Sequence, residues 1–229
     1  MMSHYKLYFA PGTCARVTIL TLFETDIDFE PILIRFMKGQ HRSPEYLQIN
    51  PNGKVPLLIA GEKPLSENLA ILTYLAKTHP DAGILPYTGE PLNDAKILSD
   101  LSWCSSGLHP IVTRTRMPNF MSNKEDATKS IYETACNAMQ PNFCVINLRL
   151  SQQPWMLGDT WSALDAYIYW VWFRVTGAGF DGSAYPHYAD HAIRMEQRDC
   201  YKNLIELETK AEKQLKEEGL IFTPPEPPK

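Results

Sequence analysis

Hydrophobic positions at the start of the chain alternate between strand spacing and helix spacing. Residues 6–9 and 29–34 are short runs rich in large apolar side chains, and they are typical of strands. Between them, after the Pro11-Gly12 break, residues 15–24 carry apolar side chains at helical spacing. The pattern predicts a strand, a helix and a second strand, followed by a short irregular stretch around residues 41–44.

A second group of elements follows the turn signal Asn52-Gly53. Residues 57–59 predict a strand, and the turn at Gly61-Glu62 predicts that this strand opens a hairpin. Ser66 stands where a helix cap belongs, and the leucines and alanine of residues 69–76 give the next helix one apolar face. The order β-α-β and then β-β-α predicts a small α/β unit.

Helical patterns replace the mixed pattern after a segment rich in Gly and Pro. The predicted organisation is an α/β domain over 1–82, a linker over 83–91, an all-helical domain over 92–221 and a flexible tail over 222–229. Within the helical domain, Ser162 and Asp165 have capping-box spacing at the head of a strongly apolar helix. Three other helices are predicted over residues 92–117, 124–150 and 196–218.

Composition narrows the class of protein. The chain has 229 residues, 44% of them apolar, and a formal net charge of -4, which favours neither nucleic acid nor an anionic membrane as partner. The apolar run 161–173 contains Asp165 and is shorter than the roughly 20 residues of a membrane span, and no secretory signal is evident. The five cysteines form no CxxC motif, which favours reduced thiols in a cytoplasm over disulfides or structural zinc.

Cys14 is the first candidate for chemistry. It follows a predicted strand and a Pro-Gly turn and precedes a helix, where the helix dipole and unpaired N–H groups favour a thiolate, with Arg16 nearby. The alternative is a small buried residue without chemistry. Thr13 is the rival, since its hydroxyl can donate a hydrogen bond to a bound thiolate.

Two further segments have a structural and a functional interpretation. Pro56 is either an ordinary loop proline or a cis-proline that exposes the backbone of Val55 to pair with a peptide. Glu67 and Asn68 open a predicted helix, whose N-terminus attracts a carboxylate, while Glu67 can pair with an amino group beside it. A plain helix cap with an acidic first turn is the alternative.

Polar residues recur on the first helix of the helical domain. Ser102, Ser106 and His109 are spaced to share one face, which lines a cleft or is simply solvated. His187 and His191 are four residues apart, but no third ligand is evident, so no metal site is predicted.

The order of these motifs resembles the glutathione transferase superfamily over nearly the whole chain. The segments that carry the resemblance are YFAPGTC at 8–14, NPNGKVP at 50–56, LSENLAI at 65–71 and WSALD at 161–165. PGTCAR and SSGLHP are similar to the corresponding segments of the bacterial beta class, a cysteine type. The resemblance implies a thioredoxin-like N-terminal domain, an all-α C-terminal domain and a homodimer.

The resemblance also implies the site and its ligand. Cys14 matches the cysteine that contacts the glutathione sulfur, with Thr13 and His109 as further catalytic candidates. The matching glutathione-binding residues are Lys38, Lys54, Val55, Pro56, Glu67, Asn68, Ser102 and Ser106. Asn68, Ala15 and Pro110 depart from the family pattern, which puts Ser, Ser and Lys at these positions.

The implied activity is glutathione transfer to or from a hydrophobic electrophile, without a metal. Two alternatives stay open: a cysteine-dependent monothiol glutathione oxidoreductase or lyase, and a non-catalytic interaction protein of the same fold. The second substrate is set by pocket shape, so no motif predicts it.

Overall fold

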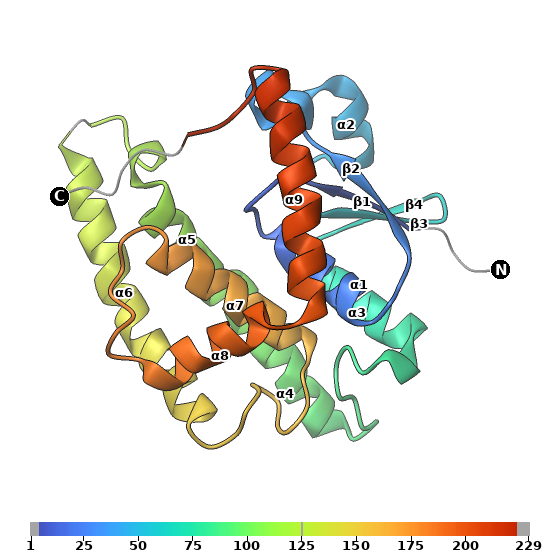
Figure 1. Cartoon of the computed structure of the whole chain (residues 1–229), viewed down its shortest axis with the longest axis vertical. Helices are drawn as coiled ribbons and strands as arrows, with labels where there is room; N and C mark the ends of the chain where they lie inside the picture. Colours follow the sequence, from blue (N-terminus) through green and yellow to red (C-terminus); the bar gives the residue numbers. More distant parts are fainter. Residues whose placement is uncertain (1–4, 125, 224–229) are drawn as a thin grey trace. The chain divides into compact units, whose positions relative to one another are not determined.

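The computed structural model describes residues 5–124 and 126–223, which form two compact units. The first unit contains residues 5–85 and 197–223, and the second contains the described residues between 86 and 196 (Figure 1). The division falls between Leu85 and Pro86, within the segment expected to be a linker.

A mixed four-stranded sheet forms the centre of the first unit. Its strand order is β2-β1-β3-β4. Strand β1 (Tyr5–Phe9) is parallel to β2 (Phe29–Leu33) and antiparallel to β3 (Leu57–Ala60), which forms a hairpin with β4 (Lys63–Ser66). The predicted strands and hairpin are confirmed.

Helices α1 (Ala15–Glu24) and α3 (Asn68–Thr78) pack against each other beside this sheet (Figure 1). Helix α1 has the predicted bounds, and its Ile19 and Leu20 are fully buried. The burial of these side chains holds the start of α1 in a fixed place relative to the sheet. Shorter elements complete the unit: α2 (Pro44–Ile49), η1 (Phe36–Lys38), η2 (Gln40–Arg42) and η3 (Pro80–Ala82).

Two local expectations in this unit were wrong. Ser66 does not cap α3, because it is the last residue of β4 and pairs with Leu57. The chain turns into the helix at Glu67, whose φ of 72° is in the left-handed region. The stretch at residues 41–44 is also not irregular, since Ser43 caps α2 by accepting a hydrogen bond from the Tyr46 backbone N–H.

Helix α9 (Asp199–Glu217) belongs to the first unit, although its sequence pattern grouped it with the helical domain. It packs along α1, and its buried side chains include Cys200, Leu204 and Ala211. The expected all-helical domain over 92–221 therefore loses its last helix to the α/β unit. Of the expected tail over 222–229, residues 224–229 lie outside the described residues.

The second unit is a bundle of helices around α7 (Ala163–Thr176). Helices α5 (His109–Arg116) and α8 (Pro186–Glu196) pack on α7, and α6 (Ala127–Leu150) packs on both of them. The remaining elements are α4 (Pro91–Ser102), the π-helix η4 (Trp103–Leu108) and η5 (Pro118–Phe120). The predicted helix over 92–117 is helical from Pro91 to Arg116, but the π segment η4 divides it into α4 and α5. Helix α8 was not predicted.

Asp165 organises the head of α7 as predicted. Its Oδ2 accepts from the backbone N–H of Ser162 at 2.9 Å, and the Ser162 side chain accepts from the Asp165 backbone, which forms the capping box. The Ser162 hydroxyl also donates to Oδ2, at 2.9 Å. Its Oδ1 accepts from the Met156 backbone N–H at 2.8 Å and lies 3.1 Å from His191 Nε2. Asp165 and its bonded partners Ser162, Met156 and His191 are all buried, so these bonds fix the start of α7 at the centre of the bundle. Within the described segments, no helix is both long and apolar enough to cross a membrane.

Candidate functional site

Cys14 lies at the N-cap of α1, at the end of a tight loop after β1. The loop is closed by Thr13, whose backbone N–H and hydroxyl both donate to the Ala10 carbonyl, at 3.3 and 2.7 Å. Gly12 has a φ of 70°, which permits the turn. The partly exposed Cys14 thiol lies 3.4 Å from the Val55 carbonyl oxygen, to which it donates.

The Val55-Pro56 peptide bond is cis, as one interpretation of the sequence required. The preceding Lys54 carbonyl is held by two donors, the Tyr46 hydroxyl at 2.6 Å and the Asn50 side-chain amide at 2.7 Å. Burial raises the pKa of Tyr46, which keeps this phenol a donor. The segment that faces Cys14 is thus fixed by side chains from α2 and its C-cap.

Gly53, in the loop before Val55, packs closely against the backbone of His41. Its φ is 58°, and a Cβ at this position would lie 2.7 Å from the His41 carbonyl oxygen. A residue with a side chain would therefore push the loop away from the neighbouring backbone.

Asn68 ties the start of α3 to the start of α1. Its side chain is only 5% exposed, its Oδ1 accepts from Thr18 Oγ1 at 2.8 Å, and its Nδ2 donates to the Cys14 carbonyl at 3.0 Å. The Asn68 amide therefore points into the protein. Glu67 beside it is the N-cap residue of α3 and is exposed, and its side chain makes no capping hydrogen bond.

The polar residues expected from the helical domain lie in and next to the π segment, with Ser102 at its N-cap, Ser106 within it and His109 at its C-cap. Ser102 and Ser106 are exposed, and the Ser106 hydroxyl donates to the Ser102 carbonyl at 2.7 Å. His109 is half-buried, with its Nδ1 3.3 Å from the Tyr167 hydroxyl and its ring centroid 4.6 Å from that of Trp170. In the part of the chain that the structure describes, no group of three His, Cys, Asp or Glu residues has a metal-binding arrangement.

Comparison with known proteins identifies the family. The family model for the N-terminal domain of glutathione S-transferases matches residues 3–77. Glutathione S-transferase GST-4.5 of Xanthomonas campestris is 31% identical over 183 residues, which cover 77% of this chain and 86% of that protein. The chain belongs to the glutathione S-transferase family.

Other members support this assignment. The disulfide-bond oxidoreductase YfcG of Escherichia coli is 30% identical over 84% of this chain and 90% of its own. A sphingomonad glutathione S-transferase solved in complex with glutathione is 28% identical, with a TM-score of 0.76 over 89% of this chain and 98% of that one. The fold of this chain is therefore shared with that solved glutathione S-transferase.

The two lysines expected at the site lie on exposed segments of the first unit. Lys38 is in η1, and Lys54 precedes Val55. The neighbouring Arg35 is engaged with Glu218 through bonds of 2.5 and 2.7 Å. Hydrogen bonding to Arg35 lowers the pKa of Glu218 to about 2, and the same bond raises the pKa of Arg35.

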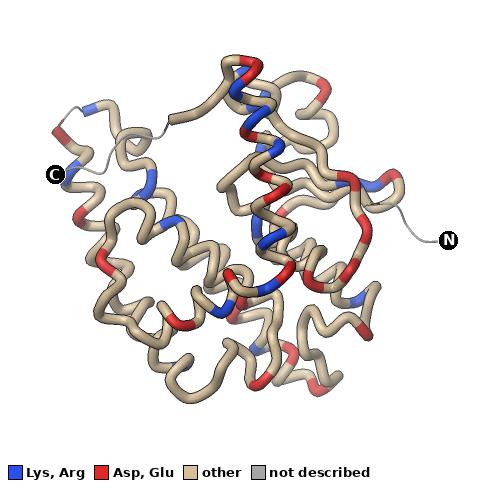
Figure 2. Tube along the Cα trace, viewed as in Figure 1, with Lys and Arg blue, Asp and Glu red and all other residues tan. Residues whose placement is uncertain are grey.

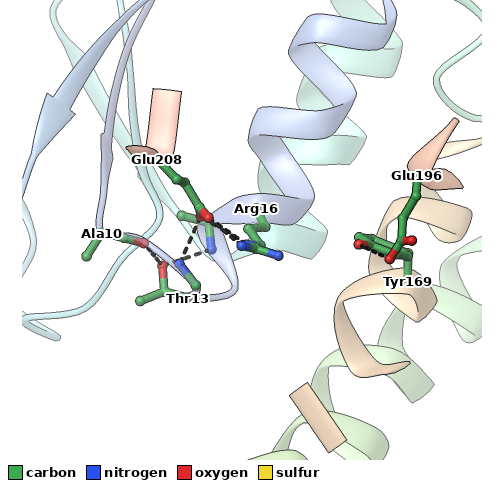
Figure 3. A network of polar contacts seen from close by, with 8 residues as sticks. Ala10, Thr13, Arg16, Tyr169, Glu196 and Glu208 are labelled. Atoms are coloured by element: carbon green, nitrogen blue, oxygen red, sulfur yellow. Dashed lines mark hydrogen bonds and ion pairs between the residues drawn. The ribbon is translucent and has the colours of Figure 1, made fainter. Parts of the chain in front are cut away.

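The sequence interpretation missed a buried carboxylate beside the Cys14 loop. Glu208 of α9 accepts from the Gly12 backbone N–H at 2.8 Å and pairs with Arg16, so the guanidinium beside Cys14 is matched by an acid (Figure 3). One signal was available. Glu208 lies four residues after Leu204 and three before Ala211, on the apolar face of its helix, where an unpaired acid is costly.

Proposed function

We propose that this glutathione S-transferase family member binds glutathione in its first unit and transfers it to a hydrophobic electrophile. The observation that carries the proposal is the convergence of three features on one place. The Cys14 thiol at the start of α1 lies against the Val55 carbonyl, before the cis bond to Pro56, and Asn68 links it to the start of α3. Each feature suits a different part of a tripeptide thiol.

The peptide part of glutathione is expected to pair with the backbone of Val55. Its γ-glutamyl carboxylate would accept from the first N–H groups of α3, to which the side chain of the N-cap residue Glu67 makes no hydrogen bond, and Glu67 would pair with the adjacent ammonium. Because the Asn68 amide is committed to Thr18 and Cys14, its contribution comes through its backbone N–H. Lys38 and Lys54 are the candidate cations for the glycine carboxylate.

The thiol of glutathione is a weak nucleophile until its thiolate is stabilised. Cys14 and the N–H groups at the start of α1 are proposed to do this. Thr13 is the weaker candidate, because its hydroxyl proton points to the Ala10 carbonyl. Thr13 would have to break this 2.7 Å bond to donate to a thiolate.

The helical unit is proposed to supply the remaining contacts. Ser102 and Ser106 present hydroxyl groups, and His109 sits against the aromatic Tyr167 and Trp170. We propose a homodimer in the cytoplasm, with part of these contacts made to the glutathione of the other subunit. The conjugation reaction of detoxifying transferases is the expected activity.

A cysteine-dependent thiol transfer is the second candidate. It is favoured by the sulfur of Cys14 at the start of α1 and by the similarity to YfcG, a disulfide-bond oxidoreductase. In this reaction the Cys14 thiolate attacks the glutathione sulfur of a mixed disulfide and releases the substrate thiolate. A second glutathione thiolate then attacks the Cys14–glutathione disulfide. It restores the Cys14 thiolate and leaves oxidised glutathione, so one glutathione thiol is consumed for each substrate thiolate released.

The test combines binding with two substitutions. We expect retention on immobilised glutathione and a rise of the melting temperature with added glutathione. Cys14→Ala should abolish thiol transfer if that is the reaction, while a surviving conjugation activity in this variant would assign the sulfur only an assisting role. Thr13→Val tests the weaker candidate in the same loop, and its effect on both activities is expected to be smaller than that of Cys14→Ala. Absence of both retention and stabilisation would reject the proposal and favour a non-catalytic interaction protein.

A further inference from the structure

Helix α9 reaches the loop that carries Cys14 through the buried carboxylate of Glu208. Oε1 accepts from the Gly12 backbone N–H at 2.8 Å and from Arg16 Nε at 3.0 Å, and Oε2 also accepts from Arg16. Glu208 is 3% exposed and Arg16 is 6% exposed. Figure 3 shows the carboxylate directed at both the loop and the guanidinium. One acid therefore joins two points of the chain.

These two points flank Cys14. Gly12 lies two residues before it in the loop, and Arg16 lies two residues after it in the first turn of α1. The left-handed Gly12 is a position where a loop is free to rearrange unless its N–H is held. By holding both flanks, Glu208 restricts where the Cys14 sulfur can lie relative to the Val55 carbonyl.

Besides Glu208, two charged residues at the ends of α9 join this helix to other parts of the first unit. Acidic and basic residues are interspersed along the helix (Figure 2). Near its start Arg198 pairs with Glu24 at the end of α1, and at its C-cap Glu218 pairs with Arg35. The Glu24 pair fastens the same two helices without touching the Cys14 loop.

We propose that Glu208 is a positioning residue for Cys14, so that the last helix of the chain sets the placement and reactivity of a thiol near its beginning. The proposal rests on the proposed function in one respect, namely that the Cys14 sulfur works at the glutathione site. The charge is essential to it. Without the negative charge, the buried Arg16 loses its ion pair with Glu208, and the restraint that this pair places on the first turn of α1 and on the Gly12 loop is weakened.

The experiment compares Glu208→Gln with Glu24→Gln in the full-length protein. Both variants remove the charge from an Arg–Glu pair between α1 and α9, but Glu24 is eight residues, about 12 Å along the helix axis, from Arg16. Alkylation of each cysteine by iodoacetamide is followed by peptide mass spectrometry over a range of pH. Cys144, which is exposed on α6, is the internal standard for reagent and pH.

We expect Glu208→Gln to change the rate of Cys14 alkylation relative to Cys144 by about tenfold or more and to shift the midpoint of its pH profile. The turnover number with saturating glutathione should fall by a similar factor, because a misplaced reacting group is costly even when binding is retained. Glu24→Gln should stay within about twofold of the wild type in both measurements.

The proposal would be overturned if folded Glu208→Gln and Glu24→Gln show the same rate and pH dependence of Cys14 alkylation. This holds whether both variants match the wild type or both differ from it. If Glu208→Gln does not fold, Glu208→Asp takes its place. It keeps the charge but is one methylene shorter, so the Cys14 alkylation rate is expected to change by less than about tenfold but by more than in Glu24→Gln, and a wild-type profile would overturn the proposal. Alkylation needs no glutathione, so a wild type that fails to bind glutathione rejects the proposed function without altering this result.

Discussion

Replacing Asn68 with alanine tests the link between the two helices at the site. The side chain makes two buried hydrogen bonds, one to Thr18 Oγ1 and one to the Cys14 carbonyl. Each contributes about 1 kcal/mol to folding, and a buried partner left without a bond costs a further 1–3 kcal/mol or so. These values set the upper end of the expected loss.

Rearrangement around the cavity sets the lower end. Thr18 follows Cys14 by four residues, so its hydroxyl can rotate to the Cys14 carbonyl, as the Thr21 hydroxyl already bonds the Val17 carbonyl at 2.9 Å. The Cys14 carbonyl also keeps the backbone N–H of Val17, at 3.2 Å. With both partners re-satisfied, one of the two bonds is regained, so the loss in free energy of unfolding is about 1–2 kcal/mol, and the Michaelis constant for glutathione is expected to rise.

Urea unfolding followed by circular dichroism measures this loss. Asn203→Ala, at an exposed position of α9, is the matched control and should stay within about 0.5 kcal/mol of the wild type. Combining Asn68→Ala with Thr18→Val should show a coupling of about 1 kcal/mol. A loss for Asn68→Ala no larger than that of the control would refute the assignment of these bonds as structural.

Three further predictions follow from the buried and paired groups. Asp165→Asn should lower the free energy of unfolding by about 3–5 kcal/mol in urea titrations, because the amide nitrogen cannot accept from the backbone donors that this carboxylate binds. Burial and a hydrogen bond to Glu24 raise the pKa of Cys200 to about 12, so iodoacetamide should leave Cys200 unmodified in the native protein at neutral pH while Cys144 reacts. The pKa of Glu218 is lower in the folded protein, at about 2, than its ordinary 4.5, so its contribution to stability is present above about pH 5 and is lost as the pH falls towards 2; Glu218→Gln should flatten the pH dependence of the melting temperature in that window, by less at high salt.

Local signals in the sequence predicted most of the first unit. The bounds of α1 and the β3–β4 hairpin follow from hydrophobic spacing and turn residues, and the capping box at Ser162 and Asp165 follows from a four-residue pattern. These features depend on residues that are close in the sequence, so the local sequence pattern is enough to predict them. The cis bond before Pro56 is different. Its ordinary frequency is about 5%, and only the order of the motifs favoured it.

The remaining features depend on contacts between distant parts of the chain. Ser66 has the composition of a cap, but pairing with β3 extends β4 through it, and the turn moves to Glu67. Glu208 bonds Gly12 across 196 positions of sequence, so no window around either residue contains the pair. The assignment of α9 to the first unit has the same cause, since its polar composition resembles that of any surface helix.

A crystal structure of the glutathione complex tests the central claim most directly. The account predicts the tripeptide backbone paired with Val55, its γ-glutamyl carboxylate within hydrogen-bond distance of the first N–H groups of α3, and its sulfur next to the Cys14 thiol. Glutathione bound elsewhere, or density that leaves the backbone of Val55 unpaired at saturating glutathione, would contradict the account.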